Sequence, residues 1–240
     1  MEPIKPYKKD AGYSYTLGAF PTIELLSCRP SLVKEVLVHS SFTDRETVDA
    51  LCGKAGIPVT VSDKTIARLS DKENCFVVGV FEKYTESLKG DVPHIVLVNP
   101  GNMGNLGTIL RTAAAMGIYG IAIITPGVDA FHPKAVRASM GALFRLRHRY
   151  YDSFESYRRD FPAHGIFCFM LDEAHSLALS DVEKPELFSL VFGNEASGLP
   201  AEFASYGQSV IIPQTEAVDS LNLTIAVGIG SYVFMKEKHS

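Results

Sequence analysis

Apolar residues in the second half of the chain recur with two periods, which predict strands alternating with helices. Residues 95–98 form a short apolar run typical of a buried strand, and the run ends at an Asn-Pro pair followed by glycines. From about Asn105 the apolar residues are three and four positions apart, as on one face of a helix, and Gly117 is placed to end that helix. A second apolar run covers residues 121–125. Residues 95–125 therefore predict one right-handed strand–helix–strand unit.

The remainder of this half continues the alternation. Further strands are predicted at residues 144–147, 166–171, 190–192 and 210–212, and a final helix is predicted from about Ser220 to Lys236. The predicted fold class is α/β, with a mostly parallel sheet that has helices on both faces.

A smaller α/β unit precedes this sheet. Strand-like and helical segments alternate there, at residues 22–27, 35–39 (a strand), 43–55 (a helix), 58–61 (a strand) and from residue 75. The polar stretch 82–93 contains turn-forming residues and few apolar ones, so it is the predicted linker. We therefore predict two domains, residues 1–88 and residues 89–240.

Composition supports a folded chain and gives no strong sign of a nucleic-acid partner. The chain has 240 residues, 46% of them hydrophobic, which is enough for a buried core. Its net charge of −4 is unlike the cationic surplus that phosphate contacts require. Basic residues nevertheless cluster, although each is equally typical of a solvated surface. They are Lys5, Lys8, Lys9, Arg137, Arg145, Arg147, His148, Arg149, Arg158 and Arg159.

The four cysteines, Cys28, Cys52, Cys75 and Cys168, are widely spaced and form no CxxC pair. This pattern predicts neither a metal site nor a disulfide framework, and it fits reduced thiols in a cytosolic protein. No apolar run resembles a signal peptide or a membrane span. We expect a soluble cytoplasmic protein without a bound metal.

Three segments carry polar and glycine residues at the carboxyl ends of predicted strands, where open α/β sheets bind ligands. In the first, residues 99–112, the glycines permit close backbone approach and the helix N-terminus offers N–H groups to an anion. Arg111 lies roughly 140° around this helix from Leu106, so it is placed either in solvent or over the strand ends, where its guanidinium would bind a phosphate. The second segment, residues 190–200, is a weak signal alone. In the third, residues 211–232, Asp219 or Ser220 is the predicted helix N-cap.

Several reaction classes are disfavoured by what these segments lack. The sequence has no Ser/His/Asp order, no HExxH and no Lys-Ser/Thr ending to the glycine-rich loop, which argues against hydrolase, zinc-protease and P-loop chemistry. The series G-N-M-G-N-L-G approaches a dinucleotide-binding loop, and Asp129 lies at roughly the spacing of a ribose-binding acid. Because Asp129 follows the turn after the second strand, we treat an NAD-dependent oxidoreductase as a minor alternative.

The same segments carry a family resemblance. The stretch from Asn102 to Arg111, F-G-N-E-x-x-G-L at residues 192–199, and I-P followed by S-L-N at residues 212–222 resemble, in order, the three motifs of the SpoU (TrmH) branch of the knotted SPOUT RNA methyltransferases. The resemblance extends over residues 95–232 and, weakly, to a front domain of L30e-like fold that binds substrate in this family. It implies a deep trefoil knot, an exception to ordinary chain topology, and a homodimer with its active site near the subunit interface.

The resemblance also implies a reaction and a set of site residues. The family transfers a methyl group from S-adenosylmethionine to a ribose 2′-hydroxyl of RNA. The positions matching its polar residues around the ribose are Arg111, Asn105, Glu195, Ser220 and Asn222. The positions matching its main-chain cradle for S-adenosylmethionine are Gly193, Ile212 and Leu221.

Chemistry makes Arg111 the most informative of these positions. A guanidinium stays protonated at ordinary pH, so we favour a role in binding the phosphate beside the ribose and stabilising the 2′-oxyanion over a role as the base. Asn105, Ser220 and Asn222 would then orient the ribose and Arg111, and Glu195 would fix the guanidinium or its loop. For Ser220 a helix cap is an equal explanation.

Two positions depart from the family pattern. Ala196 and Glu216 stand where the family often has glycine, so we expect a differently shaped loop near the cofactor. The main hypothesis is 2′-O-methylation of ribosomal RNA. The alternatives are methylation of transfer RNA and a non-catalytic RNA-binding homologue, and the second would be expected to have lost the equivalents of Arg111 or Asn222.

Overall fold

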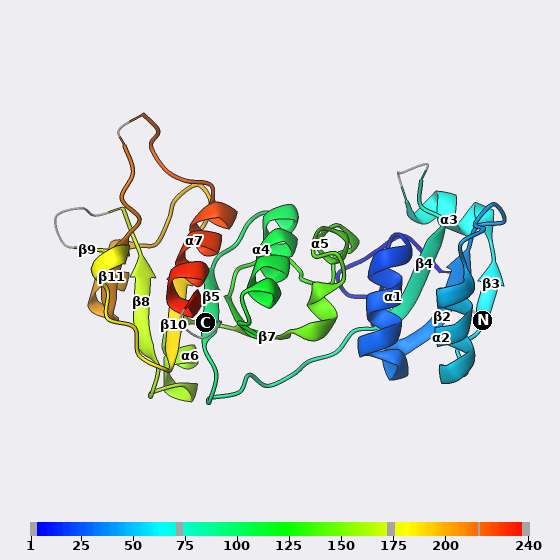
Figure 1. Cartoon of the computed structure of the whole chain (residues 1–240), viewed down its shortest axis with the longest axis horizontal. Coiled ribbons are helices and arrows are strands. Elements are labelled where there is room, and N and C mark those ends of the chain that lie inside the picture. Colours follow the sequence, from blue (N-terminus) through cyan, green and yellow to red (C-terminus); the bar gives the residue numbers. More distant parts are fainter. Residues whose placement is uncertain (1–3, 71–73, 172–175, 216, 237–240) are drawn as a thin grey trace. The chain divides into compact units, whose positions relative to one another are not determined.

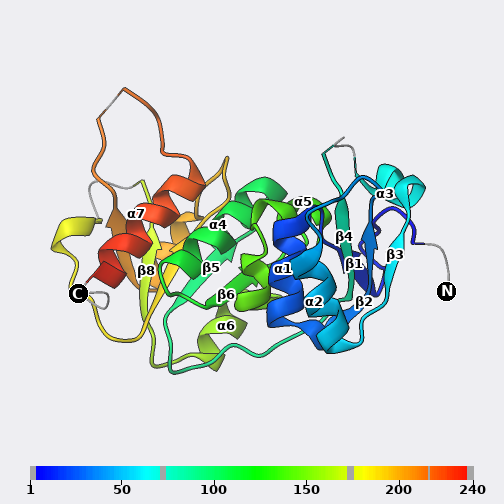
Figure 2. The same cartoon turned by 45° about the vertical axis from the view of Figure 1, so that its right-hand side comes forward.

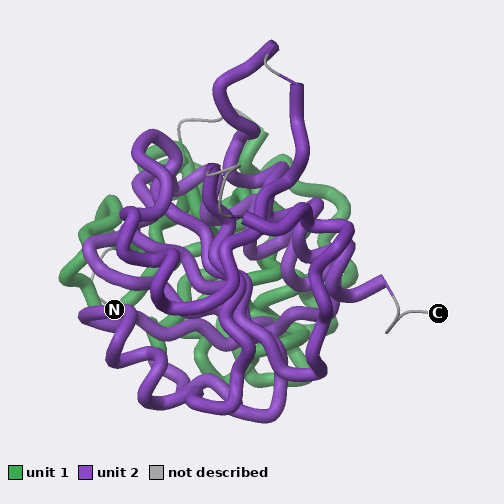
Figure 3. The backbone as a smooth tube through the Cα atoms, turned by 90° about the vertical axis from the view of Figure 1, so that its left-hand side faces the viewer, with its two compact units in different colours: residues 1–84, 129–145 green, residues 85–128, 146–240 purple. Residues whose placement is uncertain are grey.

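A computed structural model describes residues 4–70, 74–171, 176–215 and 217–236. Glu216, one of the two departures from the family pattern, lies outside these residues. The chain forms two compact units, residues 1–84 with 129–145 and residues 85–128 with 146–240 (Figure 3). Each unit has its own sheet.

Unit 1 is a small α/β unit (Figure 1). Its sheet has the order β1-β4-β2-β3, in which β4 is antiparallel to both neighbours and β2 is parallel to β3. The strands are β1 (Tyr13–Tyr15), β2 (Val33–Val38), β3 (Val59–Val61) and β4 (Val77–Glu82). The helices are α1 (Ala19–Cys28), α2 (Glu46–Ala55), α3 (Asp63–Leu69) and α5 (Pro133–Ala138), with 3-10 turns at η1 (Pro30–Leu32) and η2 (Ala142–Arg145).

Unit 2 is built on a seven-stranded sheet of order β7-β6-β5-β10-β8-β11-β9, with every pair of neighbours parallel. The strands are β5 (His94–Val98), β6 (Gly120–Ile124), β7 (Arg147–Tyr151), β8 (Gly165–Phe169), β9 (Leu177–Ala178), β10 (Phe188–Phe192) and β11 (Gln208–Ile211). The helices are α4 (Met103–Ala115), α6 (Phe154–Asp160) and α7 (Leu223–Met235), with 3-10 turns at η3 (Leu179–Asp181) and η4 (Ala201–Ser205). The predicted parallel sheet is therefore confirmed.

Alternate residues of these strands face different helices, because successive side chains of a strand point to opposite faces. Val96, Val191 and Cys168 pack in one cluster with residues of α6. Phe188 and Phe167, on the other face, contact the ring of Phe234 in α7. Helices α4 and α7 lie side by side (Figures 1 and 2), so the sheet has helices on both faces.

The predicted strand–helix–strand unit is β5-α4-β6, and its helix ends as expected. Gly117 has φ +75°, in the left-handed region that glycine adopts at low cost. Its N–H donates to the carbonyl of Ala114, and the N–H of Ile118 donates to that of Ala113. This pair of bonds is the Schellman arrangement, which satisfies two carbonyls of the last turn.

Several boundaries differ from those predicted. Residues 142–145 form a 3-10 turn, and the strand starts only at Arg147, because an apolar run alone does not distinguish a turn that buries Leu143 and Phe144 from a strand. The final helix starts at Leu223, three residues after the predicted start. The elements β1, β9, α3, α5 and α6 were not predicted, and the three helices among them have at most seven residues, too few to show a helical period. The predicted domain boundary after residue 88 stays a prediction.

Residues 129–145 complete the core of unit 1, although they lie between β6 and β7 in sequence. The ring of Phe81 in β4 is fully buried and lies 5.1 Å from the ring of Phe144 and 6.0 Å from that of Phe131. The guanidinium of Arg29 donates to the carbonyl of Phe144 at 3.0 Å. Unit 1 therefore depends on a segment distant in sequence.

We predict that Phe144→Ala lowers the free energy of unfolding by about 3–5 kcal/mol, because it leaves a cavity beside Phe81 in a closed core. The matched control is Phe20→Ala, since Phe20 belongs to the same unit and is 54% exposed. This control should lower the free energy of unfolding by less than about 0.5 kcal/mol. Urea denaturation measures both, and equal effects would show that residues 129–145 do not contribute to this core.

Candidate functional site

A cavity of about 440 Å³ lies at the carboxyl ends of β8, β10 and β11. Its lining comes from residues 169–171 at the end of β8, residues 192–199 at the end of β10, two alanines of η4, and part of residues 210–226. Its apolar wall includes Phe169, Met170 and Phe192. The carboxyl ends of parallel strands are where open α/β sheets place ligands, so this cavity is the candidate site.

The loop after β10 is folded tightly against itself. The N–H of Gly198 donates to the carbonyl of Asn194 at 2.9 Å, and the N–H of Asn194 donates to the carbonyl of Gly198 at 3.2 Å. A Cβ at Gly193 would lie 2.1 Å from the carbonyl carbon of Gly198, so only glycine fits there. The side-chain oxygen of Asn194 accepts from the N–H groups of Ala196 and Ser197, which further stabilises the turn.

Glu195 joins this loop to the start of α4. Its carboxylate accepts hydrogen bonds from the N–H of Gly101 at 2.9 Å, the N–H of Asn102 at 3.1 Å and the side-chain amide of Asn105 at 3.2 Å. Burial raises the pKa of Glu195, but these three bonds and one from its own N–H hold the pKa below its usual value. The carboxylate is therefore charged at neutral pH and fixes the glycine-rich turn.

These bonds correct the prediction of an open anion site at the start of α4. The side chain of Asn102 is the N-cap and accepts from the N–H groups of Gly104 and Asn105. Together with Glu195 it accepts from the N–H groups of residues 101, 102, 104 and 105, which are among those that the sequence suggests for a phosphate. Glu195 was predicted to fix either the guanidinium of Arg111 or the loop. Its hydrogen bonds are to the loop that leads into α4.

Asn194 is a residue that sequence reasoning missed. Its side-chain amide donates to the carbonyl of Asn99 at 2.8 Å. Asn99 has φ +52°, a left-handed conformation that asparagine tolerates better than most residues. The available signal was the Asn-Pro pair at residues 99–100, since a residue before proline is steered away from helical conformation and often marks a turn.

The predicted polar residues fall into separate groups. Glu195 and Asn105 are hydrogen-bonded to each other, and Glu195 and Ser220 line the cavity. Arg111 is exposed on α4, two turns beyond the start of the helix, and is not among the cavity-lining residues. Asn222 does not line the cavity either. All three predicted cofactor positions, Gly193, Ile212 and Leu221, do line it.

The N-cap of the final helix is Asn222, which corrects the expectation of Asp219 or Ser220. The side-chain oxygen of Asn222 accepts from the N–H of Thr224 at 2.8 Å and from its hydroxyl at 2.7 Å. Asparagine is as good an N-cap as serine or aspartate, so composition alone did not separate the three. Ser220 lies before the helix, exposed at the cavity, where capping no longer explains it.

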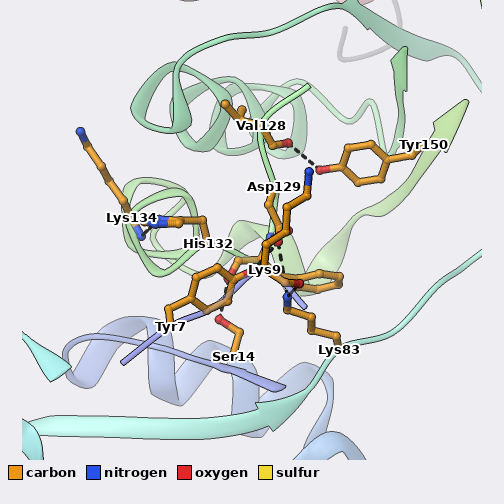
Figure 4. Close-up of polar contacts among 10 residues, drawn as sticks. Tyr7, Lys9, Ser14, Lys83, Val128, Asp129, His132, Lys134 and Tyr150 are labelled. Atoms are coloured by element: carbon orange, nitrogen blue, oxygen red, sulfur yellow. Dashed lines mark hydrogen bonds and ion pairs between the residues drawn. The ribbon is translucent and has the colours of Figure 1, made fainter. Parts of the chain in front are cut away.

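Asp129, the ribose-binding acid of the oxidoreductase alternative, is engaged within unit 1 (Figure 4). Its carboxylate accepts from the N–H of Phe131 at 2.8 Å and from the hydroxyl of Tyr7. Lys83 lies 3.4 Å from the same carboxylate, with both side chains largely buried. This carboxylate therefore has a structural role, and the oxidoreductase alternative loses its supporting residue.

Within the described residues no group of three His, Cys, Asp or Glu side chains could hold a metal ion. The same part of the chain contains four free cysteines. Among the described helices, none has the length and apolar character needed to cross a membrane.

The comparisons with known proteins identify the family. The model of the SpoU rRNA Methylase family matches residues 93–232, more than half of the chain. The chain belongs to this family. The match covers the parallel sheet of unit 2 from β5 to β11, the cavity and helix α7 as far as Tyr232.

Curated relatives extend the match beyond this region. An uncharacterized tRNA/rRNA methyltransferase of Synechocystis is 31% identical over 77% of this chain and 69% of its own length. The 23S rRNA (adenosine(1067)-2′-O)-methyltransferase of Streptomyces laurentii is 31% identical over 75% of this chain and 70% of its own. An AdoMet-bound rRNA methyltransferase from Sinorhizobium meliloti superposes with a TM-score of 0.81 at 28% identity, over 94% of this chain and 88% of that one.

We predict that Glu195→Gln lowers the free energy of unfolding by about 1–3 kcal/mol, because the new amide NH₂ would face the N–H groups of Gly101 or Asn102 without an acceptor. The control is Glu202→Gln on η4, where the glutamate is exposed. Urea denaturation should show little change in the control. An equally small change for Glu195→Gln would contradict a structural role for the carboxylate.

Proposed function

We propose that this protein methylates a ribose 2′-hydroxyl of ribosomal RNA with S-adenosylmethionine as methyl donor. The observation that carries the proposal is that the three family positions for the cofactor, Gly193, Ile212 and Leu221, line one cavity at the strand ends. Family membership and the printed activity of the Streptomyces laurentii relative support the reaction. A 23S rRNA (guanosine(2553)-2′-O)-methyltransferase of Bacillus subtilis, 24% identical over 85% of this chain, favours ribosomal over transfer RNA.

The cavity fits S-adenosylmethionine in size and chemistry. Its volume lies within the roughly 300–1,000 Å³ of small-molecule pockets. The glycine at residue 193 lets the main chain approach a ligand closely, and the apolar side chains of Phe169, Met170 and Phe192 suit an aromatic base. When bound, the cofactor supplies an electrophilic methyl group on a sulfonium.

The protein's side chains then have to align the ribose of the RNA and stabilise the oxyanion that forms on its 2′-oxygen. Glu195 holds Asn105 and the turn at residues 101–102, so the start of α4 is fixed with respect to the cavity. Ser220 is exposed at the cavity and free of a capping role, so we assign it to hydrogen bonding with the ribose. Fixed polar groups of this kind lower the barrier because they are oriented before the reaction starts.

Arg111 has the role of binding the phosphate next to the target ribose. It is exposed on α4, the helix whose first turn is fixed by Glu195 and Asn102. A planar guanidinium binds phosphate oxygens through two parallel hydrogen bonds and stabilises negative charge that develops beside it. Asn222 acts through α7, whose start it caps.

The finer architecture belongs to the same proposal. A trefoil knot in the C-terminal part of unit 2 and an L30e-like, substrate-binding unit 1 are supported by the family and by the similarity to the Sinorhizobium structure over 94% of the chain. A homodimer is supported by one face of α7, where Ile225, Ile229 and Tyr232 are 51%, 36% and 59% exposed. Residues at these spacings share a helix face, and an exposed apolar face of this kind marks a protein contact.

We predict that Arg111→Ala lowers kcat for labelled-methyl transfer to unmodified ribosomal RNA by roughly 100-fold, because a fixed cation no longer stabilises the oxyanion. Arg111→Lys should be impaired less, since it keeps the charge but loses the planar donor pair. The affinity for S-adenosylmethionine should change less than about twofold, because Arg111 does not line the cavity. Nuclease mapping should locate the label in a 2′-O-methylnucleotide.

The control for this measurement is Arg159→Ala, which removes an exposed arginine from α6. Full activity of Arg111→Ala would overturn its role while leaving the reaction intact. Bound cofactor without methyl transfer by the unsubstituted protein, to ribosomal RNA and to transfer RNA, would instead favour the non-catalytic alternative.

We predict that Ile229→Glu converts a homodimer into a monomer in sedimentation experiments at micromolar concentration, because a buried unpaired carboxylate destabilises an apolar interface. The control is Val61→Glu on β3, which places the same charge at a residue that is 57% exposed in unit 1. A monomeric unsubstituted protein would contradict the dimer.

A further inference from the structure

Four polar side chains form a buried chain of contacts at the opposite end of the unit 2 sheet from the cavity. His94 is the first residue of β5, and Ser189 is the second residue of β10. Tyr157 belongs to α6, and His164 immediately precedes β8. All four are at most 6% exposed, and neither the reaction nor the family motifs involve them.

The first half of the chain of contacts runs from a main-chain carbonyl through His94 to Ser189. The ring nitrogen Nε2 of His94 lies 2.8 Å from the carbonyl oxygen of Lys89. The other ring nitrogen, Nδ1, lies 2.8 Å from the hydroxyl of Tyr157. That hydroxyl is 2.6 Å from the hydroxyl of Ser189.

The second half mirrors the first. The hydroxyl of Ser189 lies 3.0 Å from Nδ1 of His164, whose Nε2 lies 3.2 Å from the carbonyl oxygen of Gly90. Both ends of the series are therefore main-chain carbonyls in the stretch that leads into β5. A carbonyl oxygen only accepts hydrogen bonds, so each histidine must carry a hydrogen on Nε2.

When both histidines are neutral, this series of contacts has one hydrogen too few. There are five contacts in series, and each requires one hydrogen. A neutral imidazole has one N–H and each hydroxyl has one O–H, so four groups supply four hydrogens. One contact between lone pairs would remain, and a buried polar group without its hydrogen bond is costly. A single added proton supplies the fifth hydrogen.

We propose that these four side chains form a buried site that binds one proton and that, with the proton bound, fastens the carbonyls of residues 89 and 90 to the amino end of the sheet. The added proton makes one imidazole a donor at both nitrogens and completes all five hydrogen bonds. Its bond to the main-chain carbonyl then becomes charge-assisted and stronger than a neutral one.

His164 is the histidine that binds the proton. Burial lowers the pKa of both imidazoles, and for His94 burial and the neighbouring His164 lower it to about 4. Carbonyls that favour the charged form act in the opposite direction, one on His94 (Lys89) and two on His164 (Gly90 and Phe188). The pKa of His164 remains below its usual value, so the proton binds only at a pH below that at which a free imidazole becomes protonated.

The geometry disfavours the binding of a second proton. The rings of His94 and His164 are 4.6 Å apart, so two imidazolium charges would repel each other in a buried site. Among the described residues, the other titratable groups facing the pair are phenols, Tyr157 on α6 and, beside it, Tyr151 on β7. Burial raises the pKa of both phenols, so they stay neutral and offer no compensating negative charge.

The test is a titration of the histidine side chains by ¹⁵N NMR from pH 7.5 to pH 4.5, with the full-length protein. The expected result is that His164 alone becomes an imidazolium while His94 stays neutral, with assignments from His94→Gln and His164→Gln. Ser189→Ala removes two contacts and one hydroxyl, so the remaining contacts are complete without an added proton. The titration of His164 should then shift to lower pH by at least about one unit, a tenfold loss of proton affinity.

Ser209→Ala is the matched control, because Ser209 is a buried serine on β11 of the same sheet. Its hydroxyl donates a hydrogen bond to the sulfur of Met170 and is not part of the series. In the Ser209→Ala variant, His164 should titrate as it does in the unsubstituted protein. Tyr157→Phe should shift His164 as Ser189→Ala does, and it provides a second variant if the first does not fold. The proposal is overturned if both histidines titrate together, or if removing either hydroxyl leaves the titration of His164 unchanged.

Discussion

The hydrogen bonds of Glu195 are the interaction on which the site depends. One carboxylate from the loop after β10 accepts from two N–H groups and one side-chain amide at the start of α4. Asn194 adds a bond to Asn99, the residue in a left-handed conformation. Two glycine-containing loops, each without regular structure of its own, thereby hold each other in place. A rigid contact of this kind fixes where the first turn of α4 lies relative to the cavity, and a reacting ribose needs such fixed geometry.

Much of the unit 2 fold could be predicted because local and long-range signals agree there. The run at residues 95–98, the apolar stripe from Leu106 and the glycine at residue 117 each correspond to an observed feature. The prediction was wrong at residues 144–147, where burial of Leu143 and Phe144 in a 3-10 turn produced the same apolar signal as a strand. Short elements such as α5 and α6 have too few residues to show a period.

The sequence predicted part of the cavity lining but not the hydrogen bonds that hold it. The motifs that resemble the family indicated Gly193, Ile212 and Leu221, and all three line the cavity. The partners of Glu195 were not predictable, because its carboxylate contacts residues more than 90 positions away. Which polar residue caps α7 was equally hidden, since serine, aspartate and asparagine are almost equivalent as caps. The predicted catalytic roles await the measurements proposed above.

The discontinuous composition of unit 1 limits how this protein can be recombined or divided. Because residues 129–145 supply Phe131 and Phe144 to the core around Phe81, a fragment that stops before them would expose that ring to water. A chimera that exchanges the front of the chain with a relative would need to exchange this internal segment together with it. Substitutions in the two pieces are then expected to compensate one another, so that the segment between β6 and β7 varies in step with the N-terminal residues.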